Sequence, residues 1–146
     1  MVADRALTPD DAAVALRSFP RRFRAVFARP DDDEDRFDPD QVARRPGTDG
    51  VTAAEHLAAA TELVVATGAV ARSLDATALP DATSDDGRPI AELLGAFDVA
   101  STDAAERVSA VASGDWTTGP LHTVQDAIGA VGVRLRQAEA TLRSVR

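Results

Sequence analysis

One stretch, residues 51–74, restricts the fold of this chain more than any other. It reads VTAAEHLAAATELVVATGAVARSL, contains no proline, and begins with a T-x-x-E capping box in which Thr52 and Glu55 can each accept a hydrogen bond from a first-turn amide. Because many of its residues are Ala or Gly, the predicted helix is thin, and neighbouring helices can approach it closely on several sides. The stretch therefore predicts the central helix of a bundle.

The chain before this stretch predicts a first helix that begins at Thr8-Pro9, with Thr8 as its cap and Pro9 in its first turn. Pro20 lies inside the pattern and removes one backbone hydrogen bond, which predicts a kink or a short break. Several arginines make this helix basic, and they could form an anion site, a solvated face, or ion pairs with the acidic run that follows. The apolar stripe of the helix is formed by Ala12, Leu16, Phe19, Phe23 and Val26.

Two connecting segments separate the first three predicted helices. The first, residues 30–50, begins with an acidic run that predicts a solvated loop, and its residues 38–44 predict one short helix. The run DDDED lacks the alternating ligands, central Gly and distant Glu of an EF-hand, so it does not indicate a calcium site. The second segment, residues 75–87, is rich in turn residues and long enough to cross a bundle.

A third helix is expected from Pro89 to about Ser113-Gly114, where a glycine is typical of a helix end. Its apolar residues keep steps of four and three throughout. The segment 101–103 could instead cap a new helix, but the unbroken phase favours one long helix. Trp116 is then expected in a loop at 115–120.

A fourth helix is expected to open with a second capping box at Thr123, and its apolar stripe continues to Val145. Gly129 and Gly132 lower helix propensity, which indicates close approach of a neighbouring backbone. Four amphipathic helices without a strand pattern predict an all-α protein, a single four-helix-bundle domain spanning residues 1–146.

Composition excludes several classes of function. The 146 residues contain no cysteine, so a disulfide, a thiolate metal site and a cysteine nucleophile are all excluded. The net charge of -8 argues against binding to duplex nucleic acid, and five Phe with one Trp and no Tyr provide few stacking platforms for single strands. The sequence shows neither a secretory signal nor an apolar run of membrane-spanning length, so a soluble, cytoplasmic protein without membrane association is expected.

The two histidines are the first candidates for chemistry. His56 stands at the position where it would complete a hydrophobic staple with Val51, and His122 directly precedes the predicted cap of the fourth helix. Packing and capping at helix ends explain both. A shared metal site would require them on facing helix ends with carboxylates such as Glu55 or Asp126. Helical metal motifs, a phosphate-binding loop and a nucleophile elbow are all missing, so the residues alone name no catalytic site.

Four segments carry a family resemblance: LRSFPRRFRAVF in the first helix, ARRPGTDGVTAAEHLAAATEL at the start of the second, GDWT after the third, and DAIGAVGVRLRQAEATL in the fourth. In this order the chain resembles the DinB-like superfamily, which includes the N-terminal domains of mycothiol-dependent maleylpyruvate isomerases. The resemblance covers most of the chain. It implies a four-helix bundle in an up-down-down-up arrangement, often a homodimer.

The resemblance also implies where a metal site would lie. Active members carry three metal-binding side chains, usually histidines, one on the second helix and two on the fourth. Their second-helix motif ends E-H-L-x-H, whereas this chain reads EHLAA, so Ala59 occupies the ligand position. The two positions on the fourth helix correspond to Ala130 and Arg134. Because alanine offers no lone pair and arginine brings a positive charge, no metal cofactor is expected.

Two functions from different classes follow. The first is a DinB-like domain that binds a small molecule or a protein partner and does not transfer thiols by the family mechanism. Arg134 in such a domain could bind an anionic group or could simply be solvated. The alternative is a mycothiol-type S-transferase whose zinc or nickel is held by shifted ligands drawn from His56, His122, Glu55, Glu62 and Asp126. A structural subunit of a larger assembly is a third possibility. The candidate binding residues are His56, Glu62, Trp116 and Arg134.

Overall fold

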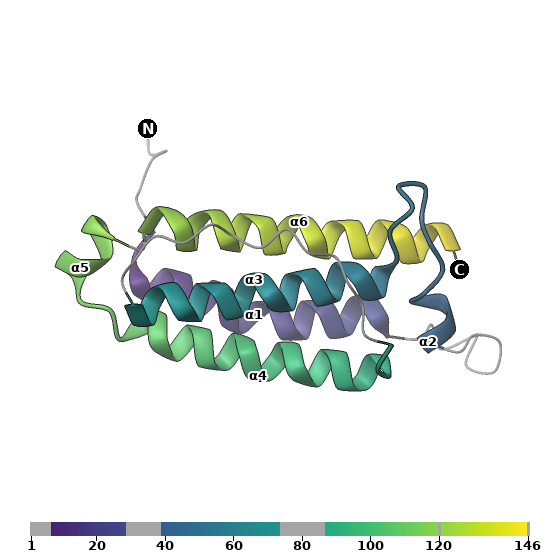
Figure 1. Ribbon diagram of the computed structural model, residues 1–146, viewed down its shortest axis with the longest axis horizontal. Coiled ribbons are helices and arrows are strands. Elements are labelled where there is room, and N and C mark those ends of the chain that lie inside the picture. The colour runs from purple at the N-terminus through teal and green to yellow at the C-terminus, as the bar shows by residue number, and fades with distance from the viewer. Residues whose placement is uncertain (1–6, 29–38, 74–86, 120, 146) are drawn as a thin grey trace.

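The structure is a computed structural model that describes residues 7–28, 39–73, 87–119 and 121–145. In these residues the chain is all-helical, which confirms the all-α prediction. The acidic run at 31–35 and the connection at 75–86 lie outside the described residues. Four long helices lie side by side, with α2 and α5 near opposite ends (Figure 1). The elements are α1 (Pro9–Phe27), α2 (Pro39–Val42), α3 (Ala53–Ser73), α4 (Ile90–Ser109), α5 (Ser113–Thr118) and α6 (Leu121–Val145).

The long helices run in two directions: α1 and α6 one way, α3 and α4 the other (Figure 1). Hydrogen bonds from the two short helices show which ends meet. The Asp40 carboxylate of α2 accepts from the Ile90 amide at the start of α4, at 2.6 Å. At the other end Trp116 of α5 donates to the carbonyl oxygen of Leu7, directly before α1, at 2.7 Å. Each short helix thus ties the beginning of a long helix to a distant part of the chain.

The first helix starts as predicted but is not interrupted. The Thr8 hydroxyl accepts the amide of Asp11 at 3.1 Å, and a proline occupies the first turn. Pro20 lies within the continuous α1 and is itself buried, so the predicted break is absent. The helix is held on both sides of the proline by core packing, which includes an edge-to-face contact of Phe23 with Phe97 of α4 at 4.8 Å between ring centroids. This burial outweighs the loss of one backbone hydrogen bond.

The stretch at residues 51–74 forms α3, and its capping box is confirmed. The Glu55 amide donates to the Thr52 hydroxyl and the Thr52 amide to the Glu55 carboxylate, both at 3.1 Å. More than half of the α3 residues are buried, and the helix packs against both α4 and α6. A Cβ added at Gly68 would lie 3.6 Å from the Ala104 Cα, so α3 and α4 approach closely there.

The second half of the chain departs from the sequence prediction at its helix ends. The helix α4 does continue through Ser101, as the apolar phase predicted, but it ends at Ser109. Ser113-Gly114, the predicted helix end, instead opens the short helix α5. The helix α6 begins at Leu121, so Thr123 lies inside its first turn and is not the cap. Burial of Leu121 and of Trp116 accounts for the change, because the segment packs against the core as helix.

The two glycines of α6 also differ from the prediction. A Cβ at Gly129 would meet nothing within 4 Å, and one at Gly132 would meet only the end of the Arg136 side chain at 3.8 Å. The predicted close approach at these glycines is therefore wrong. Close helix contact occurs at Gly68 instead.

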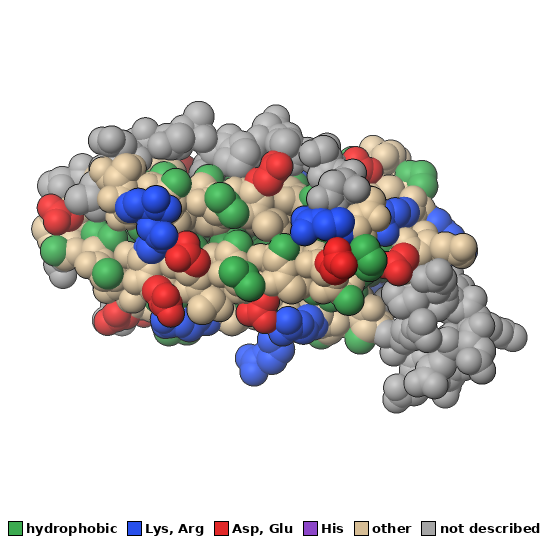
Figure 2. Space-filling view, turned by 60° about the horizontal axis from the view of Figure 1, so that its bottom comes forward, with side chains coloured by type: hydrophobic (Ala, Val, Ile, Leu, Met, Phe, Trp, Pro, Cys, Tyr) green, Lys and Arg blue, Asp and Glu red, His purple; other side chains and the backbone are tan. Residues whose placement is uncertain are grey.

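The surface of the described residues is mixed in charge. On the face shown in Figure 2, acidic and basic side chains alternate with isolated apolar ones. The exposed large apolar residues lie on four different helices and are Val14, Val65, Val99 and Val133. Within the described ranges, no helix has both the length and the apolar character that crossing a bilayer requires.

Candidate functional site

A buried histidine in α3 meets an arginine from α6. The side chain of His56 is 1% exposed, and its Nδ1 lies 3.1 Å from Nη1 of the partly buried Arg134. A guanidinium group can only donate hydrogen bonds, so Nδ1 accepts. The neutral ring therefore carries its hydrogen on Nε2. This contact joins residues 78 positions apart in the sequence.

The second ring nitrogen of His56, Nε2, is turned toward a carboxylate in the loop before α3. Asp49 Oδ2 lies 3.5 Å from His56 Nε2, while Oδ1 accepts the Val51 amide at 2.9 Å. The 3.5 Å separation is too long for a good hydrogen bond, so the geometry is one of charge and dipole attraction. Among the described residues, Nε2 is a buried polar atom without a hydrogen-bond partner. Gly50, with φ of +77°, allows the turn that places Asp49 here.

Burial and charge together fix the protonation of this cluster. Burial lowers the pKa of His56, and the positive charge of Arg134 lowers it further, while Asp49 opposes both. The pKa of Asp49 is also lowered, chiefly because its carboxylate accepts the Val51 amide hydrogen bond. At neutral pH the cluster is therefore a neutral imidazole between a guanidinium and a carboxylate. Since the ring is almost fully covered, it is placed to link two helices, and a substrate has little access to it.

The positions that the DinB-like resemblance assigns to metal ligands lie beside this contact. Ala59 follows His56 by three residues on α3, and Ala130 precedes Arg134 by four on α6, so each shares a helix face with its partner in the contact. Because α3 and α6 run in opposite directions, both alanines are displaced toward the same end of the molecule (Figure 1). Ala59 is buried and Ala130 is partly buried against the core. The three positions thus fall at neighbouring levels of the α3–α6 interface.

The fallback metal ligands do not converge. His122 is exposed in the first turn of α6, twelve residues before Arg134, which corresponds to about 18 Å along the helix from the level of His56. Asp126 is exposed on the same helix one turn later. In the part of the chain that the structure describes, no group of three His, Cys, Asp or Glu residues is placed to hold a metal ion. The shifted-ligand alternative required His56 and His122 to meet, and the structure separates them.

The remaining binding candidates lie apart from the His56 cluster. Glu62 is partly exposed on α3, and in the described ranges its carboxylate has no hydrogen-bond or ion-pair partner. Trp116 is 2% exposed, and the hydrogen bond from its Nε1 to Leu7 fixes the chain before α1. Its role is therefore in packing at the opposite end of the molecule. The structure does not bring Glu62, Trp116 and Arg134 together.

Two of the α1 arginines have partners among the described residues. Arg24 makes an ion pair with Asp98 of α4 at 2.7 Å, and the guanidinium of Arg22 lies over the Phe19 ring, 5.3 Å from its centroid. The acidic run that could pair with other members of the group lies outside the described residues.

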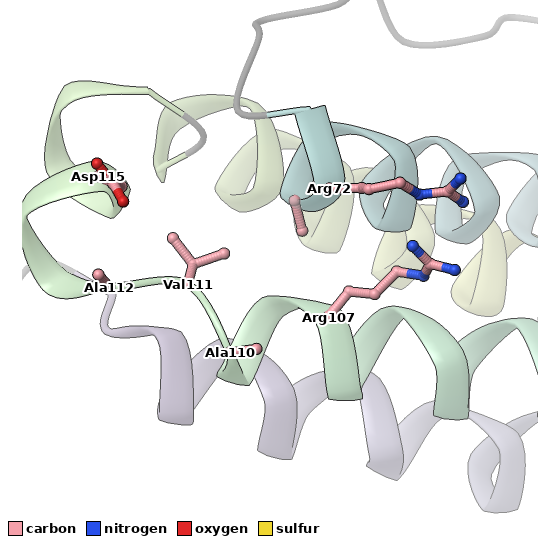
Figure 3. Close-up of a pocket in the computed structure, with 7 residues that line it drawn as sticks. Arg72, Arg107, Ala110, Val111, Ala112 and Asp115 are labelled. Carbon is pink, nitrogen blue, oxygen red and sulfur yellow. The ribbon is translucent and has the colours of Figure 1, made fainter.

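A cavity that the sequence did not reveal lies near the ends of α3 and α4 beside α5. It has a volume of about 330 Å³, and Arg72, Arg107 and Asp115 supply its charged lining (Figure 3). Neither Arg72 nor Arg107 is part of a motif that would predict a binding site. The available signal was weak: each arginine stands near the end of a predicted helix, where basic residues are common.

Comparison with models of protein families, with curated proteins and with solved structures found no significant match to this chain.

Proposed function

We propose that this chain is a divergent DinB-like four-helix bundle that acts as a binding or interaction domain without the metal site of that superfamily. The all-helical fold and the opposed directions of the helix pairs α1/α6 and α3/α4 support the up-down-down-up arrangement. The sequence resemblance supports the family. The proposal rests on these two lines of support.

The contact between Arg134 and His56 carries the functional part of the proposal. At the position where the resemblance places a metal ligand, Arg134 donates instead to a buried imidazole. A guanidinium group has no lone pair to offer a cation and repels it electrostatically. The neighbouring ligand position, Ala59, is buried and has no donor atom. The same region of the scaffold therefore serves as a helix-to-helix link.

A homodimer belongs to the proposal through the resemblance alone. The exposed valines of the described residues are spread over four helices and do not mark one apolar interface. Sedimentation velocity over a range of protein concentrations tests this part: a dimer is expected, and a monomer at all concentrations would refute it. A protein that is stable only within a larger assembly would aggregate or unfold when isolated.

Metal analysis tests the loss of the site. Protein purified without chelators is expected to contain less than stoichiometric zinc or nickel by plasma mass spectrometry. One zinc or nickel ion per chain would overturn the proposal.

The family assignment is tested by restoring the ligands. The triple variant Ala59→His, Ala130→His and Arg134→His is expected to gain one nickel site per chain in isothermal titration calorimetry, because the three positions lie at neighbouring levels of the α3–α6 interface. The single variant Ala59→His is the matched control and is expected to gain no such site. Circular dichroism verifies that both variants are folded. A folded triple variant that binds no more nickel than the control would refute the DinB-like placement of these positions.

A further inference from the structure

The cavity beside α5 is separate from the His56 cluster. Its residue Arg72 follows His56 by sixteen positions on α3, which corresponds to about 24 Å along the helix. Two arginines, one from α3 and one from α4, line the cavity, and Asp115 of α5 lies across from them (Figure 3). Small apolar side chains complete the lining: Ala71, Ala110, Val111 and Ala112. The cavity thus has an apolar surface between a basic margin and an acidic one.

The arginine from α4 is held in place by its neighbours. Arg107 Nε donates to the Asp103 carboxylate at 2.8 Å, one turn earlier on the same helix. Its stem passes Gly68 of α3, where an added Cβ would lie 3.6 Å from the Arg107 Cδ. An alanine at position 68 would make an ordinary van der Waals contact with this stem. The Arg107 stem therefore lines the cavity with part of its conformational freedom already removed, which lowers the entropy lost on binding a ligand. Its guanidinium group lies at the margin of the cavity and extends away from Asp115 (Figure 3).

The arginine from α3 has no such partner. Arg72 is exposed, and within the described ranges nothing forms a hydrogen bond or an ion pair with it. In Figure 3 its guanidinium group extends toward the same side as that of Arg107. Asp103 balances only one of the two positive charges. The basic margin thus retains a charge and several N–H donors for another anion.

Stabilisation of helix ends is the competing explanation for these arginines. Both stand in the last turn of a long helix, where a positive charge interacts favourably with the helix dipole. That interaction accounts for a basic residue at each position. It does not account for the cavity of about 330 Å³ that the two side chains adjoin, which is open to solvent, only partly apolar, and within the size range of small-molecule sites.

We propose that this cavity binds a small organic anion, with a carboxylate or phosphate group at the Arg72–Arg107 margin and a short apolar body against Ala71, Ala110 and Val111. Guanidinium groups bind both oxyanions through paired hydrogen bonds, so the two head groups share one recognition chemistry. This inference deepens the proposed binding role by naming a ligand class, and it does not depend on the metal positions.

Titration with three probes of equal chain length tests the charge preference. Hexanoate and monohexyl phosphate present the two oxyanions, and hexylammonium is the cationic control. Two-dimensional ¹H–¹⁵N NMR of the full chain is expected to show saturable shifts of cavity residues with at least one anion, at about tenfold higher affinity than with hexylammonium. The anion that binds with the higher affinity identifies the preferred head group. Failure of both anions to saturate, or equal binding of hexylammonium, would overturn the proposal.

Two single variants and one control locate the site. Arg72→Gln and Arg107→Gln are each expected to weaken the preferred anion about tenfold. The control Arg143→Gln removes the same charge from an exposed residue at the other end of the molecule and is expected to leave the affinity unchanged. Because Arg72 is exposed, its variant keeps the test valid if Arg107→Gln unfolds. Lower thermal stability with unchanged anion affinity would support the helix-end explanation and refute the site.

The result of the anion titration is distinguishable from the result of the metal analysis that tests the proposed function. One zinc or nickel ion in the wild-type protein would overturn the absence of a metal site and leave the anion titration as it is. Loss of anion binding would leave the metal result as it is.

Discussion

Replacement of Arg134 by Met isolates the contact that joins α3 to α6. Met keeps much of the apolar stem of the arginine and removes every hydrogen-bond donor. The Nδ1 atom of His56, whose side chain is 1% exposed, would then lack the partner that now lies 3.1 Å away. An unsatisfied buried acceptor costs roughly 1–3 kcal/mol. Because Arg134 is itself partly exposed, water can reach part of the vacated space, so we expect a loss of about 1–2 kcal/mol.

Thermal and urea unfolding followed by circular dichroism measure this loss. For a domain of this size it corresponds to a decrease in Tm of roughly 2–8 °C. Arg136→Met is the matched control, because Arg136 is exposed on the same helix and its loss should change stability by less than about 0.5 kcal/mol. Equal stability of the two variants would refute the conclusion that the contact links the helices.

The pH dependence of the same variant gives an independent check on the electrostatics. In the wild type the pKa of His56 is lowered in the folded state, so below about pH 6.5 the unfolded chain binds a proton that the folded chain resists. Stability is therefore complete above the unfolded pKa and decreases as the pH falls toward the folded pKa. Removal of the Arg134 charge raises the folded pKa. The stability deficit of Arg134→Met should thus shrink between pH 7 and pH 5, and a constant deficit would contradict the assigned charge effect.

Three further substitutions test single interactions of the fold by urea unfolding. Thr52→Ala removes the hydroxyl of the α3 capping box and should cost about 1 kcal/mol, and an unchanged midpoint would contradict the cap. Ser101→Ala removes a buried hydroxyl that has no partner in the described residues, so stability should be retained or rise by about 1 kcal/mol, and a clear loss would indicate a partner. Trp116→Phe removes the Nε1 donor to Leu7 and should cost about 1–2 kcal/mol, and a loss below about 0.3 kcal/mol would show that the bond contributes nothing.

The long helices could be predicted because their signals are local. The apolar period, the capping box at Thr52 and the Thr8-Pro9 start each depend on residues within a few positions of one another. The same rule explains the success at Ser101, where an unbroken period outweighed a polar residue. Local backbone chemistry also predicted a kink or a short break at Pro20, and there tertiary packing kept α1 unbroken.

The helix ends in the second half could not be predicted locally. Thr123 has the sequence of a cap, but Leu121 and Trp116 are buried, and this burial extends α6 by three residues, 121–123. The start of α4 likewise has no side-chain cap of its own, because Asp40 accepts the Ile90 amide from fifty residues away. Such interactions depend on which helix ends meet in space. A local sequence pattern contains only one of the two partners in each such interaction.

The candidate site shows the same difference between local signals, which the sequence contains, and long-range contacts, which it does not. His56 and Arg134 could each be named from the sequence as candidate binding residues. Their local patterns, however, predicted packing at a helix end for His56 and an anion-binding or solvated role for Arg134. The register of two antiparallel helices brings them together, and that register follows from core packing along the whole length of α3 and α6. The cavity between Arg72 and Arg107 was invisible for the same reason, since its walls come from three separate helices.

The position of the Arg134–His56 contact gives the proposed loss of metal a physical rationale. A metal ion held by α3 and α6 would link these helices through ligands at the levels of Ala59, Ala130 and Arg134. Loss of such ligands would also remove the link, at a place where the buried imidazole of His56 still needs a partner. A guanidinium at position 134 supplies both the link and the partner, because it extends from α6 and donates a hydrogen bond to Nδ1 of His56 on α3. On this reasoning Arg134→His alone should neither restore a metal site nor keep wild-type stability. A variant that bound one metal ion per chain and kept wild-type stability would contradict the proposed loss of the metal site.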